Sequence, residues 1–193
     1  MLEYIKGKVS ELTPTYLIVE NNGIGYFIKI SLNYYSIIEE NKEVKVFIHE
    51  VIREDTRDLY GFAKKEEREI YRKLISVSGV GPNTALVMIS SLSTSEIITA
   101  ISSGDVNTIK SVKGIGLKTA QRVIVDLKDK IGNMSENIEL FDNKGNTIKD
   151  ESLSALIMLG FNKKQAEKTI DNIVKNGKET DVEGVIKAAL KLL

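Results

Sequence analysis

The sequence predicts a multidomain α+β protein with an N-terminal five-stranded OB-type β-barrel, an all-α tandem helix–hairpin–helix domain and a C-terminal three-helix bundle. Three observations lead to this prediction. Short runs rich in β-branched and aromatic residues fill residues 1–63, the apolar spacing becomes helical from Lys64, and a Gly-x-Gly motif recurs after 35 residues. The expected divisions of the chain are residues 1–63, 64–132, 133–150 and 151–193.

The first 63 residues carry five strand-like runs, separated by turn signals such as Thr13-Pro14 and Asn21-Asn22-Gly23. Five short strands in about 60 residues favour a closed barrel, because closure leaves no exposed strand edge. An OB-type barrel fits this count, and an SH3-like barrel fits it almost as well. The expected strands are Leu2–Val9, Tyr16–Glu20, Gly25–Ile30, Val44–Ile52 and Leu59–Phe62.

Residues 64–132 read as all helical, with apolar residues at helical spacing around Ile70–Ile75 and again around Ala85–Leu92. Ser93 followed three residues later by Glu96 has the pattern of a capping box, so a helix is expected to begin there. A further helix is predicted from about Leu117 to Lys130.

The last part of the chain is predicted to be a linker followed by a small bundle. Residues 133–150 are polar and contain no long apolar run, which is typical of a flexible linker. Residues 151–193 have helical periodicity with breaks at Gly160 and Asn176-Gly177, which indicates three short helices. So small a bundle buries little surface, as is usual for a module that binds a partner.

Composition excludes several kinds of site. There is no cysteine, which rules out disulfides and thiolate metal ligands. The single histidine, His49, lies in an apolar-alternating stretch and is expected to be a strand residue, so neither a metal nor a cofactor is expected. The net charge is zero, but residues 64–133 hold 11 Lys/Arg against 7 Asp/Glu. No apolar run approaches the roughly 18 residues that span a bilayer, so we expect a cytoplasmic chain without membrane contact.

An internal repeat carries the functional argument. Leu74–Leu92 aligns with Ile109–Leu127 at an offset of 35 residues. The repeat indicates two copies of one helix–hairpin–helix unit, in which glycine supplies the positive φ that a tight turn requires. The identical pairs include Ser76/Ser111, Val77/Val112, Gly79/Gly114, Gly81/Gly116, Thr84/Thr119, Ala85/Ala120 and Leu92/Leu127.

Each hairpin ends where a new helix begins, and a helix start presents unpaired N–H groups that bind phosphate readily. Such contacts position a protein on nucleic acid without reading bases, so binding should be indifferent to sequence and sensitive to salt. A single Gly-x-Gly could equally be only a tight helix–helix turn, but two copies in the basic third of the chain favour DNA. The expected DNA-binding residues are Gly79, Gly81, Asn83, Thr84, Gly114, Gly116, Lys118, Thr119 and Arg122.

Nucleotide binding is disfavoured. A dinucleotide fingerprint would need a third glycine where Thr84 stands and a strand before the motif. No Walker-type loop is present, so the chain is not expected to hydrolyse ATP.

The order of the segments and several local motifs resemble the RuvA family, the Holliday-junction-binding subunits of the bacterial branch-migration machine. The resemblance spans the whole chain. It implies a homotetramer, alone or as two tetramers face to face, that holds a four-way junction open and recruits a hexameric RuvB-type ATPase motor. The junction resolvase RuvC is a further expected partner. The motifs are Arg53-Glu54-Asp55 before Leu59-Tyr60-Gly61-Phe62, the two glycine hairpins with Lys118-Thr119-Ala120, and Ala155-Leu156-x-x-Leu159-Gly160-Phe161.

The resemblance also implies roles for residues outside the hairpins. Glu54 and Asp55 would form an acidic pin at the junction crossover, although alone they fit a charged turn. The C-terminal bundle resembles a UBA-like domain whose apolar residues would contact the motor, and these residues fit ordinary core packing equally well. They are Leu156, Leu159 and Phe161.

Two positions depart from the family pattern. Asn83 and Leu117 stand where many members carry lysine, which predicts a shallower dependence of binding on salt.

Two other functions fit parts of the sequence. Helix–hairpin–helix units also occur in DNA glycosylases and nucleases, but Asp126 is best explained as an exposed helix residue. The acidic residues Glu66, Glu67 and Glu69 alternate with basic ones, as on a solvated helix face. A general structure-selective or single-strand-binding protein without a motor would use aromatic platforms such as Tyr16 and Phe27, but residues 1–63 hold 7 basic against 10 acidic residues.

Overall fold

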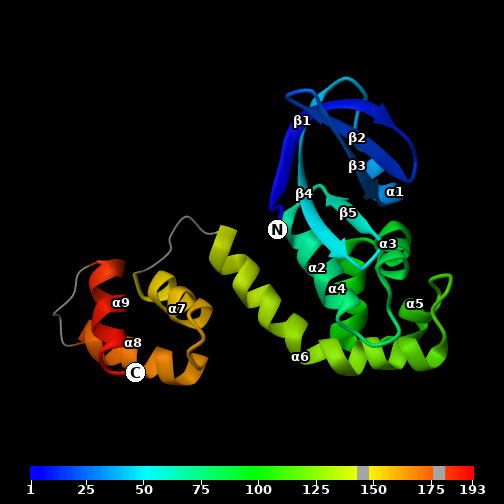
Figure 1. Ribbon diagram of the computed structural model, residues 1–193. Helices are drawn as coiled ribbons and strands as arrows, with labels where there is room; N and C mark the ends of the chain where they lie inside the picture. The colour runs from blue at the N-terminus through cyan, green and yellow to red at the C-terminus, as the bar shows by residue number, and fades with distance from the viewer. Residues whose placement is uncertain (143–147, 176–180) are drawn as a thin grey trace. The chain divides into compact units, whose positions relative to one another are not determined.

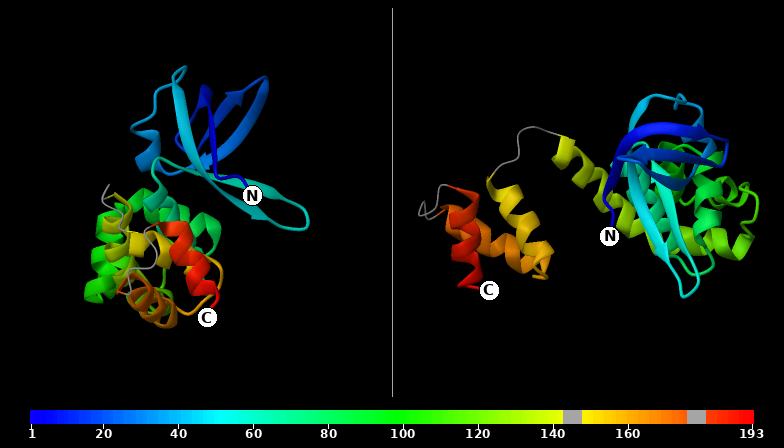
Figure 2. Two further views of the ribbon diagram at one scale, coloured as in Figure 1. Left: turned by 90° about the vertical axis from the view of Figure 1, so that its left-hand side faces the viewer. Right: turned by 45° about the horizontal axis from the view of Figure 1, so that its top comes forward.

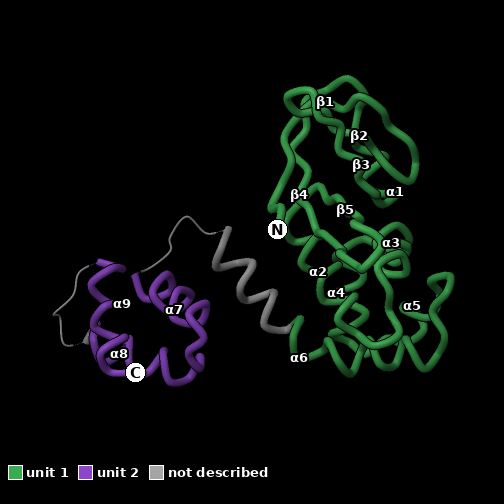
Figure 3. The backbone as a smooth tube through the Cα atoms, in the orientation of Figure 1, with its two compact units in different colours: residues 1–133 green, residues 134–193 purple. Residues whose placement is uncertain are grey.

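The computed structural model describes residues 1–142, 148–175 and 181–193 (Figure 1). The chain divides into two compact units, Met1–Asn133 and Met134–Leu193, which Figure 3 shows in green and purple. The first unit contains the barrel and most of the helix–hairpin–helix region, and the second contains the C-terminal helices.

Five strands close into a barrel in the order β1-β2-β3-β5-β4, with β4 pairing back to β1. The β3–β5 pair is parallel and a short helix, α1, lies between β3 and β4. This Greek-key order is that of the OB-type barrel, so the SH3-like alternative is excluded. The elements are β1 (Tyr4–Leu12), β2 (Tyr16–Asn21), β3 (Ile24–Ile30), α1 (Leu32–Tyr35), β4 (Glu43–Ile52) and β5 (Arg57–Phe62).

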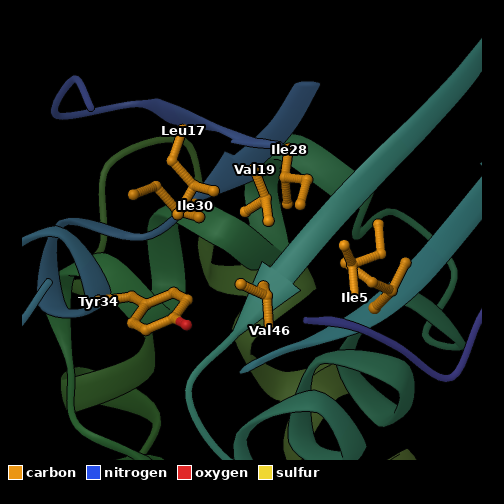
Figure 4. Close-up of a cluster of buried hydrophobic side chains, with 8 residues drawn as sticks. Ile5, Leu17, Val19, Ile28, Ile30, Tyr34 and Val46 are labelled. Atoms are coloured by element: carbon orange, nitrogen blue, oxygen red, sulfur yellow. The ribbon is translucent and has the colours of Figure 1, made fainter. Parts of the chain in front are cut away.

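Alternation of apolar and polar residues builds the barrel core. In β1 every second residue from Ile5 to Val9 is buried, as expected for a strand with one face inside. Figure 4 shows the inward side chains gathered from four of the strands and from α1. The buried cluster consists of Ile5, Leu17, Val19, Ile28, Ile30, Tyr34, Val46 and Ile48.

The helical region begins directly after β5. Pro82 occupies the first position of α3, and Ser93 with Glu96 forms the predicted capping box at the start of α4. Gly104 ends α4 in a left-handed conformation, at φ 78°. The helices are α2 (Lys65–Ile75), α3 (Pro82–Ser91), α4 (Thr94–Ser103), α5 (Val106–Lys110) and α6 (Leu117–Asp142).

Arg68 of α2 fastens the helices to the barrel. It is only 3% exposed, and its guanidinium donates to the Glu3 carbonyl at 2.8 Å, the Ile48 carbonyl at 3.3 Å and the Glu3 carboxylate at 2.7 Å. The hydrogen bond from Arg68 lowers the pKa of Glu3. The Tyr71 ring of α2 packs against Tyr60 and Phe62 of β5, with centroid separations of 5.3 and 4.9 Å. Barrel and helices therefore belong to one compact unit (Figure 2).

Helix α6 differs from the prediction. It continues to Asp142 instead of ending near Lys130, and α7 already begins at Ile148, so the predicted linker over residues 133–150 is helical at both of its ends. The sequence from Met134 to Leu140 is polar but rich in helix-favouring Glu, Met and Leu. Polar composition was therefore a poor guide to where this helix ends.

The second unit contains the predicted three-helix bundle, formed by α7 (Ile148–Met158), α8 (Lys163–Lys175) and α9 (Val182–Leu190). Gly160 breaks the chain after α7 with φ 97°, as predicted. The predicted break at Asn176-Gly177 lies outside the described residues. The buried core consists of Leu156, Ala166, Ile170, Ile173, Val185 and Ala189.

Within the described part of the chain, no single helix is long and apolar enough to cross a membrane. Helices α3 and α4 reach that length and composition only together, across a bend of 101°. Their apolar residues Met88, Ile89, Ile97 and Ile101 are buried in the first unit.

Candidate nucleic-acid interface

The two glycine hairpins have the same backbone geometry. Gly79 and Gly114 adopt positive φ, at 94° and 91°, which only glycine tolerates readily. Corresponding backbone hydrogen bonds close both turns, so the repeat in sequence is a repeat in structure. These bonds join Val80 N to Val77 O (3.0 Å) and Ile115 N to Val112 O (3.1 Å), then Ala85 N to Gly81 O and Ala120 N to Gly116 O (both 2.9 Å).

Open space lies beside three of the four glycines. A Cβ built at Gly81, Gly114 or Gly116 would meet no protein atom within 4 Å. Gly81 is in ordinary extended backbone, at φ −83° and ψ 168°, so its lack of a side chain is not required by the turn. What it provides is clearance, which a phosphate backbone would need in order to approach the start of α3.

Buried apolar residues anchor the two hairpin tips. Val80 and Ile115, which lie between the glycines, are 4% and 5% exposed. The first turn of α3 has no side-chain cap, so its backbone N–H groups at Asn83 and Thr84 are left for an external acceptor. The first hairpin thus holds its helix start firmly while exposing donors.

Positive charge gathers at the second hairpin. Lys110, Lys113 and Lys118 are all exposed there. The residues 35 positions earlier are Ile75, Ser78 and Asn83, none of which is charged. The sequence prediction included Lys118 but missed the other two, although Lys113 directly precedes Gly114. The second hairpin therefore carries more positive charge in its own residues than the first.

Helix α6 supports the first hairpin. Arg122 is exposed, and its guanidinium donates to the Ser78 carbonyl at 3.3 Å. A Cβ at Gly79 would lie 3.8 Å from Oγ1 of Thr119, whereas nothing covers the corresponding Gly114. Arg122, expected from the sequence only to bind phosphate, is therefore already engaged in bracing the first hairpin. Thr84 and Thr119 are half-buried.

Asn83 is tied to the barrel. It lies exposed in the first turn of α3, and its Oδ1 accepts a hydrogen bond from the Tyr60 hydroxyl at 2.9 Å. Leu117, which directly follows Gly116 of the second hairpin and corresponds to Pro82 in the repeat, is 49% exposed.

The acidic turn Glu54-Asp55 joins β4 to β5 at the tip of a long hairpin (Figure 2). The Arg53 N–H donates to the Thr56 carbonyl at 2.8 Å and closes the turn. Both carboxylates are exposed, and neither forms an ion pair with any residue that the structure describes. The neighbouring Arg57 pairs with Glu50, so it does not neutralise them.

The three predicted motor-contact residues differ in exposure. Leu156 is fully buried in the core of the second unit, so the interpretation of Leu156 as a contact residue is revised to a core role. Phe161 packs partly against that core, while Leu159 is 60% exposed beside Met158 at 87%. Leu159 is therefore the member of the predicted set that is most available to a partner.

No cluster of three or more His, Cys, Asp or Glu side chains that could hold a metal ion occurs among the described residues.

Models of known protein families match three successive parts of the chain. The RuvA N terminal domain matches residues 1–61, the SAM-like helix-hairpin-helix tandem matches residues 71–129, and the RuvA C-terminal domain matches residues 147–193. Relatives named Holliday junction branch migration complex subunit RuvA are 53% identical in Christiangramia forsetii, 49% in Flavobacterium psychrophilum and 47% in Bacteroides thetaiotaomicron, in each case over the whole of both chains. The chain belongs to the RuvA family.

Proposed function

We propose that this chain binds four-way (Holliday) DNA junctions without reading their sequence and serves as the non-catalytic subunit of a branch migration complex in recombination and repair. The observation that carries the proposal is the pair of equivalent hairpins in one compact unit, each with open space beside a helix start. The full-length relatives bear the name of that complex. A subunit that acts on DNA junctions in a bacterium would work in the cytoplasm, and that is the location we propose.

Phosphate binding by the hairpins follows from their chemistry. Unpaired N–H groups and the partial positive charge of a helix start attract an anion, and Lys110, Lys113 and Lys118 add charge at the second hairpin. Backbone donors contact phosphate oxygens, which are the same for every base pair. Binding should therefore weaken with salt and ignore sequence.

The acidic turn supports selectivity for a junction. In a homotetramer with a fourfold axis, each copy would supply its hairpins to one arm and its Glu54-Asp55 turn to the crossover. Exposed carboxylates without ion pairs in the described chain repel phosphates. That repulsion would keep the strands at the crossover apart and limit how tightly they bind.

The second unit is the proposed docking module for a hexameric RuvB-type ATPase, which would supply the ATP hydrolysis. Its small bundle leaves Leu159 and the adjacent Met158 exposed, and such an apolar surface suits a protein partner. Phe161, which packs partly on the core, would support this surface. RuvC is proposed as a further partner of the junction complex.

A competition experiment tests the proposed function. Labelled four-way junction is bound to the full chain and challenged with unlabelled four-way, duplex or single-stranded DNA of equal nucleotide content. We expect only the four-way DNA to compete at stoichiometric concentration. The stacked pair of Tyr16 and Phe27, with centroids 4.4 Å apart and Phe27 50% exposed, is the feature that would favour a single-strand binder. Equal or better competition by single-stranded DNA would overturn the junction proposal.

Deletion of residues 150–193 tests whether junction binding and stimulation of the motor belong to different units. The shortened chain should bind junctions normally but no longer stimulate the motor, and Leu159→Ser in the full chain should reduce stimulation alone. Loss of junction binding in either variant would contradict the assignment of the second unit to the motor.

A further inference from the structure

At the first hairpin, the side chain that could donate a hydrogen bond to phosphate is a neutral amide, and a residue of the barrel holds it in place. At the second hairpin, Lys118 places a charged donor in the first turn of the following helix. At the first hairpin the equivalent residue is Asn83, whose amide is neutral and has two different ends. Only the NH₂ end can donate to a phosphate oxygen, so an amide that turned its oxygen outward would repel the ligand.

The hydroxyl of Tyr60 determines which end of the Asn83 amide faces away from the barrel. Its hydroxyl donates to Asn83 Oδ1 at 2.9 Å, which leaves the NH₂ group of Asn83 free to point away from the barrel. Tyr60 is only 1% exposed, and Asn83 is the one acceptor for its hydroxyl proton within the described chain. Turning the amide over would leave a buried hydroxyl proton without an acceptor, which is unfavourable.

The Tyr60 side chain is itself held in place by its neighbours. The Tyr60 ring packs against Tyr71 at a centroid distance of 5.3 Å, and the Lys29 ammonium lies 5.6 Å from the ring centroid. Burial raises the pKa of Tyr60, so its hydroxyl keeps the proton that it donates. The hydroxyl is therefore held in place before any DNA binds, and little freedom is lost on binding.

We infer that Tyr60 is a positioning residue for DNA binding: it holds the Asn83 amide with its NH₂ group available to a phosphate at the start of α3. This inference rests on the proposed function, because it assigns a donor within the same phosphate-binding hairpin. The amide acts beside the backbone N–H groups of Asn83 and Thr84, which the uncapped helix start leaves unpaired. Because the amide is neutral, it adds affinity without releasing a counterion.

The test is a double-mutant cycle in the full chain. Junction affinity is measured by fluorescence anisotropy over a potassium chloride series for wild type, Tyr60→Phe, Asn83→Ala and the double variant. Each single change should weaken binding roughly two- to ten-fold, the value of one neutral hydrogen bond. The double variant should bind no more weakly than Asn83→Ala, since Tyr60 acts only through Asn83. The slope of log affinity against log salt should be the same in all four.

Asn83→Asp provides a second readout. The carboxylate still accepts from Tyr60 but offers no donor, so it should weaken binding more than Asn83→Ala does. A fold defect caused by Tyr60→Phe would persist in the Asn83→Ala background and make the two effects additive, which would contradict the inference.

The outcomes separate the inference from the proposed function. A wild-type chain that does not bind junctions would overturn both. A wild-type chain that binds, with Tyr60→Phe equally tight or with additive effects in the cycle, would overturn the positioning role of Tyr60 alone.

Discussion

The two glycines of the first hairpin should respond differently to alanine, because only one of them needs glycine to fold. Gly79 has φ 94°, a conformation that costs an L-residue about 1–2 kcal/mol. Gly81 has φ −83°, and a Cβ there would meet nothing within 4 Å. The substitution Gly81→Ala therefore fills the space that we propose DNA occupies, without disturbing the fold.

The expected changes in stability and in DNA affinity distinguish the two variants. In Gly79→Ala the new methyl makes only ordinary contact with Thr119 at 3.8 Å, so the backbone conformation sets the loss of stability. In Gly81→Ala the gain from a stiffer unfolded chain and the loss from a poorer N-cap nearly offset, to within about 1 kcal/mol. Its methyl should displace a phosphate that accepts charge-assisted hydrogen bonds of about 1.5–3 kcal/mol each, a loss of about ten- to hundred-fold in affinity.

The assay combines urea unfolding with junction binding at fixed salt. Gly23→Ala is the matched control for Gly79→Ala, because Gly23 also has positive φ (80°) and open surroundings but lies in the turn between β2 and β3. It should lose stability and keep its affinity. A Gly81→Ala variant that binds as tightly as wild type would refute the claim that the glycine provides clearance for DNA, and Gly116→Ala repeats the test at the second hairpin.

Three further predictions concern Arg122, the acidic turn and His49. Arg122→Ala should lower the slope of log affinity against log salt by about 0.9 and speed amide hydrogen exchange in the first hairpin, because it removes the contact with Ser78; unchanged exchange would refute the bracing role. Neutralising the acidic turn with Glu54→Gln and Asp55→Asn should tighten junction binding and change the rate of branch migration, both measured with the motor present. If neither quantity changed, the proposed role of the turn as an acidic pin would be refuted. Burial lowers the folded-state pKa of His49 below its unfolded value of about 6.5, so protonation favours the unfolded chain and stability falls as pH drops through 6.5. Urea unfolding at pH 7.5 and 5.5 should show a smaller loss for His49→Gln than for wild type, and equal losses would contradict this.

Local patterns account for the part of the site that the sequence alone could predict. The 35-residue repeat located both hairpins, and its first glycines have the positive φ expected of a tight turn, at 94° and 91°. Ser93 and Glu96 form the predicted capping box. Each of these features depends on residues only a few positions apart, so neighbouring residues carry all the information needed.

Side-chain partners could not be predicted in the same way. Arg122 and Asn83 were both expected to bind DNA, and in the structure they also bond to Ser78 and Tyr60, which lie 44 and 23 positions away and which no local pattern indicated. Leu156 and Leu159 have similar sequence surroundings, but α8 and α9 bury the first and leave the second 60% exposed. Periodicity shows which residues share a face of a helix, but not what packs against that face.

The amino-acid sequence by itself thus determined the order of barrel, hairpins and bundle, the positions of the two glycine turns, and the acidic turn between the last two strands of the barrel. The tertiary structure determined which side chains support these parts. Packing of α3 beside the barrel brings Asn83 to Tyr60 of β5, and Arg68 joins α2 to the strands. The physical reason is that turns and helix starts arise from short-range backbone geometry, whereas buried hydrogen bonds form only when distant segments pack together.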